Sequence, residues 1–316
     1  MVVTITGGAG FIGSHLCQKF LNKKAKVICI DNFSTGSRDN ITNMLKNPDF
    51  TLVKHDITIP FTKKLSTIIM TSQIIIHLAS PASPKDYYRL PLETALVNSI
   101  GTKYLLDLAR SGNKRFVLAS TSEIYGDPKQ NPQKEEYWGY VNPVGPRSCY
   151  DESKRFSEML AMIYHREYKV DTRICRIFNT YGPGMRRDDG RVVANFISQA
   201  LQGEDLTIYG DGTQTRSFCY IDDTVEGIHL LAVKPSLSGE IVNIGNPEEI
   251  RINDLANLVI KLTDSFSQCH YTKQVEDDPE KRCPDITRIR ALLAWKPQVN
   301  LVTGLKKTIY FLQNNS

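Results

Sequence analysis

Tyr150 and Lys154 are a pair of side chains whose types and spacing could do acid–base chemistry. They stand four residues apart at the start of Tyr150–Glu167, a segment with the apolar periodicity of a helix. Four helical residues advance by about 6 Å, so both side chains project from one face and can share a site. An ammonium group beside a phenol favours the phenolate, which would make the tyrosine a usable base near neutral pH. The same spacing is common on ordinary helix surfaces, so its meaning depends on where the fold places it.

Ser120-Thr121-Ser122-Glu123 is a second polar group, directly after the predicted strand Arg115–Ala119. Open α/β sheets bind ligands at the carboxyl ends of their strands, so this position favours a site. The hydroxyl groups can hold a substrate oxygen, and Glu123 can move or position a proton or simply cap a turn. The predicted catalytic residues are Thr121, Ser122, Glu123, Tyr150 and Lys154.

Gly7, Gly10 and Gly13 form a GxxGxxG pattern between the first predicted strand and the first predicted helix. Glycines let backbone N–H groups approach a pyrophosphate at a helix N-terminus, although a plain tight turn would use the same residues. The second strand ends at Asp31, whose carboxylate can accept hydrogen bonds from an adenosine ribose and would repel a 2′-phosphate. This context predicts NAD rather than NADP, with Arg38 nearby as the feature that favours the alternative.

Short β-branched runs alternate with helical stretches through the first half of the chain. This order predicts an α/β fold with a doubly wound parallel sheet, the Rossmann arrangement. The predicted strands are Val2–Thr6, Lys26–Ile30, Thr51–Lys54, Ile74–His77, Arg115–Ala119 and Thr172–Ile177, with helices near Phe11–Leu21, Leu92–Arg110 and Tyr150–Glu167. Beyond Asn179, loops rich in Gly, Pro, Asp and Arg indicate a smaller C-terminal substrate domain. We therefore predict an NAD-binding domain, residues 1–179, and a nucleotide-sugar-binding domain, residues 180–316, while Ile241–Ile244 could return to the main sheet.

The composition is that of an ordinary globular protein, with 41% hydrophobic and 23% charged residues in a chain of 316. A net charge of +5 with scattered basic residues suits an anionic small molecule and argues against nucleic acid. The sequence contains no apolar run of membrane-spanning length and no signal-peptide pattern, so we expect a cytoplasmic protein without membrane attachment. The seven cysteines form no CxxC pair and the six histidines no HExxH motif, so we expect reduced thiols and no bound metal.

Five sequence blocks resemble the extended short-chain dehydrogenase/reductase family of nucleotide-sugar enzymes, and the resemblance covers nearly the whole chain. The blocks are HLASPASP (His77–Pro84), ASTSEIYGDP (Ala119–Pro128), YWGYVNPVGPRSCYDESKR (Tyr137–Arg155), RIFNTYGP (Arg176–Pro183) and DDGRVVANF (Asp188–Phe196). Within this family they are most similar to the UDP-glucuronate decarboxylases, also called UDP-xylose synthases. The related dehydratases carry an aspartate where this chain has Ser122, so the acid that would protonate a departing hydroxyl is missing. The resemblance therefore implies decarboxylation rather than dehydration.

The resemblance also implies which residues bind the cofactor NAD and a UDP-sugar. The implied NAD-binding residues are Gly7, Gly10, Phe11, Ile12, Gly13, Asp31, Asn32, Ser34, Thr35, Gly36, Asp56, Ile57, Leu78, Ala79, Ser80, Asn98, Tyr150 and Lys154. The implied substrate-binding residues are Tyr87, Asn179, Arg191, Tyr209, Gln214, Arg216 and Arg282. Among these, Tyr209, Gln214 and Arg216 match the segment that holds uridine and diphosphate in the family, and Arg282 is assigned to orienting the substrate.

The implied reaction is the NAD-dependent conversion of UDP-glucuronate to UDP-xylose. Oxidation at C4 makes a ketone β to the carboxylate, CO2 leaves, and hydride returns to C4. A UDP-glucuronate or UDP-hexose 4-epimerase, a decarboxylase that releases the 4-keto pentose, and a non-catalytic dinucleotide-binding regulator stay open as alternatives. Intact Tyr150, Lys154 and Glu123 argue against the regulator. The family pairs two helices into a dimeric four-helix bundle, so we expect a homodimer through Leu92–Arg110 and Tyr150–Glu167.

Overall fold

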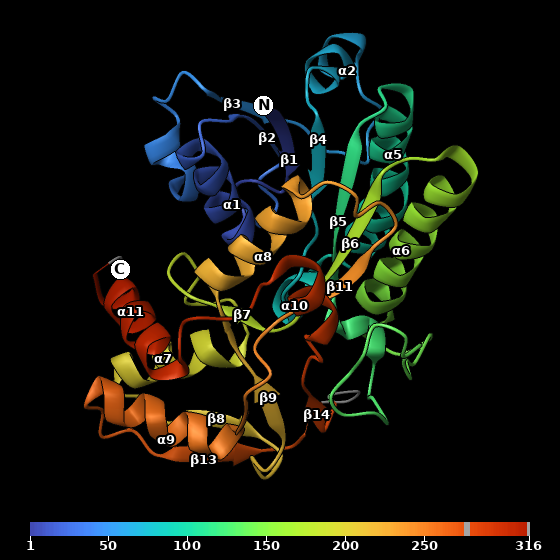
Figure 1. The fold of residues 1–316 in the computed structure, drawn as a ribbon. Coiled ribbons are helices and arrows are strands. Elements are labelled where there is room, and N and C mark those ends of the chain that lie inside the picture. Colours follow the sequence, from blue (N-terminus) through green and yellow to red (C-terminus); the bar gives the residue numbers. More distant parts are fainter. Residues whose placement is uncertain (275–278, 315–316) are drawn as a thin grey trace.

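The centre of the protein is a parallel β-sheet, shown in Figure 1. The computed structural model describes residues 1–274 and 279–314. Within these residues the main sheet has seven strands in the order β11-β6-β5-β4-β1-β2-β3, and every neighbouring pair is parallel. The strands are β1 (Val2–Thr6), β2 (Lys26–Asp31), β3 (Phe50–Lys54), β4 (Ile74–His77), β5 (Arg115–Thr121), β6 (Thr172–Ile177) and β11 (Ile241–Ile244). The predicted doubly wound parallel sheet is confirmed.

Helices cover both faces of this sheet, which explains why its strands are continuous apolar runs. In β2, Val27 and Cys29 pack toward one face, whereas Ile28 and Ile30 pack toward the other. The first face is covered by α1 (Phe11–Asn22) and α8 (Ile221–Val233), and the second by α2 (Lys63–Met70), α5 (Thr102–Ser111) and α6 (Ser148–Tyr168). The hydrophobic core therefore lies in two layers, one on each side of the sheet.

The chain returns to the main sheet after it has entered a second lobe. Strand β11 pairs with β6, with Ile241 opposite Ile174, and α8 packs against α1. Residues 221–244 thus lie in the layers of the main sheet although they follow the predicted domain boundary. The two lobes are connected by several chain crossings rather than by one linker.

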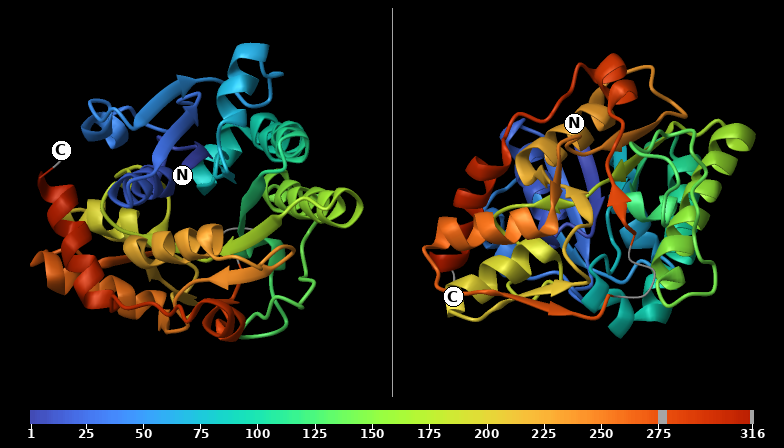
Figure 2. Two further views of the ribbon diagram at one scale, coloured as in Figure 1. Left: turned by 45° about the horizontal axis from the view of Figure 1, so that its top comes forward. Right: turned by 90° about the horizontal axis from the view of Figure 1, so that it is seen from below.

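The second lobe lies beyond the carboxyl ends of the main strands, in the lower part of Figure 1 and from two other sides in Figure 2. Its short sheets pair β8 with β13, β9 with β12 and β14, and β7 with β10. Its elements are β7 (Thr180–Tyr181), α7 (Val192–Gln202), β8 (Leu206–Tyr209), β9 (Thr215–Ser217), β10 (Cys219–Tyr220), β12 (Glu249–Arg251), α9 (Ile252–Thr263), β13 (Cys269–Thr272), β14 (Lys281–Arg282) and α11 (Leu301–Asn314). Helix α10 (Thr287–Leu293) packs against β11 of the main sheet instead. The remaining short helices are η1 (Asp39–Met44), α3 (Pro84–Arg89) and η3 (Ser122–Tyr125).

The segment predicted as a helix over Leu92–Arg110 is helical throughout, but it is not one regular α-helix. It consists of α4 (Pro91–Leu96), a π-helical turn η2 (Val97–Gly101) and α5. Within the π turn, the carbonyl oxygen of Asn98 accepts hydrogen bonds from the hydroxyls of Thr102 and Ser157. Such turns often mark functional regions, and they carry no pattern that sequence periodicity would detect.

No helix in the described parts of the chain combines the length and the apolar composition needed to cross a lipid bilayer.

A buried ion pair ties α6 to the main sheet. Both carboxylate oxygens of Glu158 accept hydrogen bonds from Arg176 of β6, at 3.0 and 2.8 Å, and one also accepts from Ser120 of β5 at 2.5 Å. Glu158 and Arg176 are both buried. This contact holds α6, which carries Tyr150 and Lys154, against strands β5 and β6.

Glu158→Ala should lower the free energy of unfolding by about 3–5 kcal/mol, because it leaves the Arg176 charge buried without its partner. Urea denaturation measures this loss. The matched control is Glu152→Ala on the same helix, whose contact with Arg155 is half exposed; it should cost about 0–1 kcal/mol. Equal losses for the two variants would contradict the role of Glu158.

Candidate active site

A cavity of about 890 Å³ lies where the main strands end and the second lobe begins. Its wall combines residues that follow β1, β2, β4, β5 and β6 with residues of α6, β8 and β9. All the predicted catalytic, NAD-binding and substrate-binding residues line it, with the exception of Asn98. The fold therefore brings these residues, which are scattered over the sequence, into one space.

The glycine turn after β1 forms one end of the cavity. Gly7 has φ = +73°, and a Cβ atom on it would lie 2.6 Å from the backbone nitrogen of Ala79. A Cβ atom on Gly13 would lie 2.0 Å from the carbonyl oxygen of Gly7, so α1 can start this close to β1 only with glycine there. Gly10, at the N-cap of α1, has no side chain that caps the helix. The N-terminus of α1 is thus open toward the cavity, an arrangement that fits a pyrophosphate.

Asp31 organises the neighbouring end of the cavity. Its two carboxylate oxygens accept hydrogen bonds from the backbone N–H groups of Ala9, at 2.9 Å, and Phe33, at 2.8 Å. Burial raises the pKa of the Asp31 carboxyl, and these two backbone hydrogen bonds act against the rise. The carboxylate lines the cavity at the end of β2, where it fits the ribose hydroxyls of a dinucleotide.

Asn98 lies behind the cavity wall. Its side-chain nitrogen donates hydrogen bonds to Ser80, at 3.1 Å, and to Ser153, at 3.0 Å. The side-chain oxygen is buried and has no hydrogen-bond partner among the described residues. Asn98 therefore positions Ser80, which does line the cavity, instead of facing the cavity itself.

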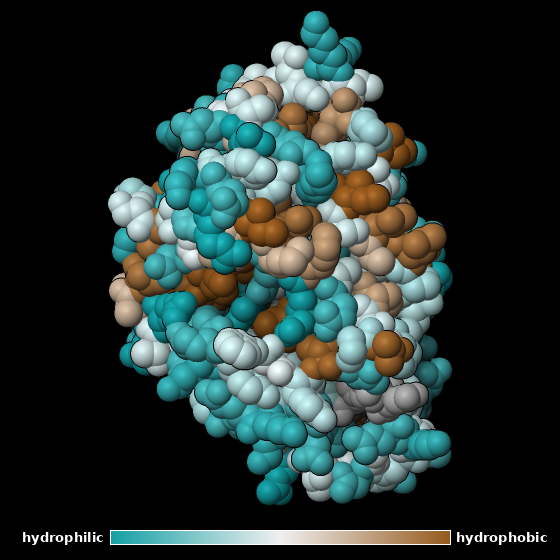
Figure 3. All heavy atoms as spheres, turned by 90° about the vertical axis from the view of Figure 1, so that its right-hand side faces the viewer, coloured by the Kyte–Doolittle hydropathy of each residue, from teal (hydrophilic) through white to brown (hydrophobic). Residues whose placement is uncertain are grey.

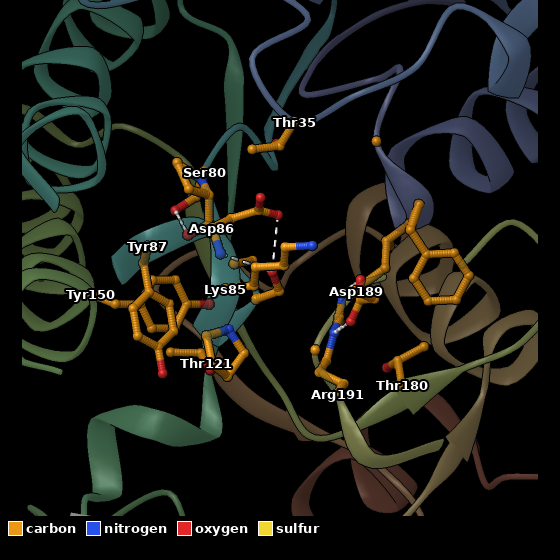
Figure 4. A pocket seen from close by; sticks show the side chains of 18 of the residues that line it. Thr35, Ser80, Lys85, Asp86, Tyr87, Thr121, Tyr150, Thr180, Asp189 and Arg191 are labelled. Atoms are coloured by element: carbon orange, nitrogen blue, oxygen red, sulfur yellow. Dashed lines mark hydrogen bonds and ion pairs between the residues drawn. The ribbon is translucent and has the colours of Figure 1, made fainter. Parts of the chain in front are cut away.

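The side chains of Tyr150 and Lys154 enter the cavity from the first turns of α6. Lys154 Nζ donates a hydrogen bond to the carbonyl oxygen of Ala119 at 2.9 Å and lies 5.9 Å from the centre of the Tyr150 ring. Figure 4 shows Thr121 beside the phenol. The tyrosine and lysine thus share one site, as their spacing predicts.

Burial controls the protonation of this pair. Burial raises the pKa of the Tyr150 phenol, as does the Glu123 carboxylate to a smaller extent, whereas a hydrogen bond with Thr121 and the charge of Arg191 oppose the rise. Burial also lowers the pKa of Lys154 to about 8. Tyr150 can therefore act as a base near neutral pH only if further positive charge beside it lowers the pKa of the phenol by more than burial raises it.

Tyr87 stacks on Tyr150, with ring centres 5.3 Å apart and ring planes 11° apart (Figure 4). Tyr87 is almost fully buried, and its hydroxyl has no hydrogen-bond partner among the described residues. Buried hydroxyls are nearly always hydrogen-bonded, so an unpaired one in a cavity wall is suited to a ligand oxygen.

Glu123 lies between two arginines. Arg147 donates a hydrogen bond to Oε2 at 2.5 Å, and Arg282 donates one to Oε1. Burial alone would raise the pKa of Glu123, but the two guanidinium charges outweigh it and lower the pKa to about 2. Glu123 is therefore an anion that can accept hydrogen bonds but cannot act as an acid near neutral pH.

The role of Arg147 was not predicted from the sequence, although it lies inside one of the blocks that carry the family resemblance. A single arginine outside any predicted element has no pattern that would distinguish it from a solvated surface residue. Two further cavity residues, Lys85 and Arg186, were also missed; they pair across the cavity rim with Asp188, at 2.7 Å, and Asp86, at 2.8 Å.

The second lobe contributes the opposite end of the cavity. Tyr209, Gln214 and Arg216 come from β8, β9 and the turn between them, and Gln214 donates a hydrogen bond to the Tyr209 carbonyl at 2.7 Å. Asn179 follows β6 and donates to the Ser217 carbonyl at 3.4 Å. Arg191, in the cavity wall, forms a two-pronged ion pair with Asp189, at 2.5 and 2.9 Å (Figure 4). Polar donors thus line the whole length from the glycine turn to β9.

No group of three or more His, Cys, Asp or Glu side chains that could hold a metal ion occurs in residues 1–274 and 279–314.

Comparison with protein families gives one match over most of the chain. Residues 3–245 match the model of the NAD dependent epimerase/dehydratase family. Two similar curated proteins are UDP-glucuronic acid decarboxylase 1 of Xenopus tropicalis, 46% identical over 98% of this chain, and UDP-glucuronic acid decarboxylase 2 of Arabidopsis thaliana, 49% identical over 96%. The aligned regions span 72% and 66% of those two relatives.

A solved structure with the same fold is that of UDP-glucuronic acid 4-epimerase from Bacillus cereus in complex with UDP-glucuronic acid and NAD. It has a TM-score of 0.88 and 30% sequence identity, and the match covers 99% of each chain.

Asp31→Asn should weaken NAD binding by about tenfold or more, because an amide cannot accept hydrogen bonds from both Ala9 and Phe33 and still receive a ribose hydroxyl. Calorimetric titration of NAD and NADP measures the change. NADP binding should suffer less, since the variant no longer repels the 2′-phosphate. Asp39→Asn, on η1 outside the cavity, is the control. Tighter binding of NADP than of NAD by the unaltered protein would contradict the assignment of Asp31.

Proposed function

Because the chain belongs to the NAD dependent epimerase/dehydratase family, we propose that it is an enzyme that converts UDP-glucuronate to UDP-xylose and CO2. The observation that carries this proposal is the arrangement of Glu123, Arg147 and Arg282 beside Tyr150. Two guanidinium groups and one carboxylate leave one excess positive charge in the cavity wall, which suits a sugar that carries a carboxylate. The identity of 46% and 49% to two UDP-glucuronic acid decarboxylases supports the same reaction.

NAD fits the first end of the cavity. The glycine turn and the open N-terminus of α1 would hold the pyrophosphate, and Asp31 would hold the adenosine ribose. When bound, NAD+ supplies a hydride acceptor at C4 of the sugar and later returns the hydride, so the reaction has no net redox change.

Tyr150 is the proposed base. Its phenolate oxygen takes the proton of the sugar 4-hydroxyl. The Thr121 hydroxyl and the nearby Lys154 ammonium would stabilise the phenolate together with the positive charge of bound NAD+, which is needed to overcome the burial of the phenol. Loss of this proton and of the hydride makes C4 a ketone β to the carboxylate. Decarboxylation requires this ketone, because its carbonyl group accepts the electrons of the bond that breaks.

Decarboxylation then moves the electrons of the breaking C5–C6 bond onto the C4 oxygen as an enolate. The protonated Tyr150 and a hydroxyl of Thr121 or Ser122 donate hydrogen bonds to that oxygen as its charge develops. One solvent proton ends on C5 and one CO2 leaves, so the atoms balance. Tyr150 finally returns its proton to the C4 oxygen.

Glu123 orders the water that delivers the proton to C5. The carboxylate stays ionised between its two arginines, so it accepts a hydrogen bond from the water and does not itself donate the proton. Ser122 occupies the neighbouring position and has no acid to offer a departing hydroxyl, which disfavours dehydration.

The substrate would lie between Tyr150 and the second lobe. Tyr209, Gln214 and Arg216 would bind the uridine diphosphate, and the charged guanidinium is suited to phosphate. The proposed contacts to the sugar and its carboxylate are Tyr87, Asn179, Arg191 and Arg282. A carboxylate clamp would stabilise the ground state more than the transition state, because the charge migrates away as CO2 leaves, so Arg282 orients the substrate.

Incubation with UDP-glucuronate and NAD+, followed by mass spectrometry of the nucleotide products, tests the proposed function. The expected product is lighter than the substrate by the mass of one CO2, and substrate labelled at the carboxylate releases labelled CO2. The similarity to a UDP-glucuronic acid 4-epimerase makes epimerisation the second candidate. A product of unchanged mass would support that candidate and exclude decarboxylation, whereas a free 4-keto pentose with accumulated NADH would show a decarboxylase that releases its intermediate.

The location of the protein is a separate proposal: a reducing, cytoplasmic compartment. All seven cysteines are free. Cys17 and Cys29 are buried and lie close enough to interact, yet they form no disulfide. Disulfides persist mainly in oxidising compartments, so these free thiols fit a reducing one.

The helical face formed by α4, η2 and α6 supports a homodimer. Leu92, Ile100, Phe156 and Met159 lie on these elements and are at least 39% exposed. Figure 3 looks at this side of the molecule and shows hydrophobic areas across it. Apolar patches of this kind mark interaction surfaces, and a second copy presents the same face.

Tyr150→Phe should lower kcat by about 10²–10⁴-fold, because the base is lost while the ring remains. Binding of UDP-glucuronate, measured by calorimetry, should be nearly unchanged. Tyr164→Phe is the matched control on the same helix, since the Tyr164 hydroxyl bonds Asp107 away from the cavity. Near-normal turnover of Tyr150→Phe would exclude Tyr150 as the base.

The double variant Phe156→Asp, Met159→Lys should convert a dimer to a monomer, because it places charges on the apolar face. Light scattering of the unaltered chain and of the variant measures both masses. Tyr310→Asp, at a highly exposed position on α11, is the control and should stay dimeric. A monomer mass for the unaltered chain would contradict the proposal.

A further inference from the structure

Arg147 connects the two groups that the proposed reaction uses on either side of the C4–C5 bond. It immediately precedes α6, and its carbonyl oxygen accepts hydrogen bonds from the backbone N–H groups of Tyr150, at 2.9 Å, and Asp151, at 3.1 Å. Its guanidinium reaches Oε2 of Glu123 at 2.5 Å. One residue therefore fixes the start of the helix that carries the base and the side chain of the carboxylate.

The Glu123 carboxylate is held at both oxygens, and the two arginines hold it differently. Arg282 comes from β14 in the second lobe, and its other terminal nitrogen donates to the Gly126 carbonyl at 3.3 Å. Arg147 comes from the same lobe as Glu123 and has Asp151 as a second acidic neighbour, with Nε 3.9 Å from Oδ2. The Nε of Arg282 is buried and has no hydrogen-bond partner among the described residues. The Nε–H group of Arg282 can thus donate a hydrogen bond to another group, whereas Arg147 uses its guanidinium to hold Glu123.

The charged and titratable groups around Glu123 come from the elements packed against it. They are Arg147, Tyr150 and Asp151 at the start of α6, Arg282 on β14 and Tyr87 on α3. Burial raises the pKa of Asp151 to about 8, and the Glu123 charge adds to the rise while the two arginines oppose it. Glu123, and not Asp151, is the carboxylate that accepts direct hydrogen bonds from both arginines.

We propose that Arg147 is a positioning residue of the decarboxylation: it holds Glu123 as an oriented anion that orders the water above C5, and it leaves Arg282 to the substrate's carboxylate. This inference rests on the proposed function. Without Arg147, one oxygen of Glu123 would lose its fixed donor and the carboxylate could rotate. Proton delivery to C5 would slow, while substrate binding through Arg282 would persist.

Arg147→Met tests the proposal because methionine keeps the apolar stem and removes the charge. At neutral pH, kcat should fall by about 10- to 100-fold while KM for UDP-glucuronate changes little. The acid-side midpoint of the kcat–pH profile should rise by about one to three pH units, because a carboxylate that loses a cationic partner is protonated more readily. NADH absorbance should build up during a single turnover, since the steps after oxidation become slow.

Arg155→Met is the matched control. Arg155 also lies on α6 and holds the same region, but its guanidinium donates to the carbonyls of Ile124 and Trp138 and not to Glu123. This variant can lose stability, yet its acid-side midpoint should stay where it is in the unaltered protein. Thermal melting of both variants separates a loss of folding from a change at Glu123.

Arg147→Lys keeps the charge without the planar fork and should restore the acid-side midpoint more fully than it restores kcat. This variant carries the test if Arg147→Met does not fold. An unmoved midpoint without NADH build-up in a folded variant would overturn the proposal, and so would a rise in KM with kcat unchanged, which would assign Arg147 to the substrate. Failure of the unaltered protein to release CO2 would instead overturn the proposed function, so the two outcomes are distinguishable.

Discussion

Parallel strands deliver all their carboxyl ends to one edge of a sheet, and every chemical group of the cavity depends on that constraint. Gly7 follows β1, Asp31 ends β2, Glu123 follows β5 and Asn179 follows β6, and all four line the same space. The helices on both faces exclude water from the strands and hold them in place. A second lobe then needs only to cover one edge to complete a closed site. The chain does so by leaving the sheet after β6 and returning as β11, which fixes the lobe against the edge at several crossings.

Low dielectric inside this cavity gives its ionisable groups their properties. Burial raises the pKa of Tyr150, which favours the neutral phenol, and lowers the pKa of Lys154, which makes its amine less basic. Neither shift by itself makes a base, so proton transfer has to be linked to the arrival of positive charge at the phenol. Glu123 shows the opposite case, because two guanidinium groups overcome the burial of one carboxylate. The same cavity therefore holds a neutral phenol at Tyr150 and a fixed anion at Glu123.

Helix α6 carries both cavity residues and residues that fix its position in the interior. Its first turns carry Tyr150 and Lys154, and one turn later Glu158 joins Arg176 and Ser120 in the interior. Buried polar contacts of this kind specify one position for the helix rather than adding much net stability. The π turn η2 packs on the same helix and aims Asn98 at Ser80 and Ser153. The position of Tyr150 is thus set in part by Glu158, Arg176 and Asn98, polar side chains that do not themselves line the cavity.

Local patterns in the sequence were enough to predict the parallel sheet, the glycine turn and the shared face of Tyr150 and Lys154. Each depends on short apolar runs, on helical spacing or on backbone freedom within a few residues. The family resemblance added the decarboxylase relationship and NAD, which the comparisons support. The tertiary structure alone decided the surroundings of Glu123, since its partners Arg147 and Arg282 lie 24 and 159 residues away in the sequence. It also decided that Asn98 supports the wall and that a π turn divides its helix. Contacts across such separations depend on how the layers pack, and they produce no periodic pattern in the sequence. The ionisation state of Glu123 therefore cannot be predicted without the tertiary structure.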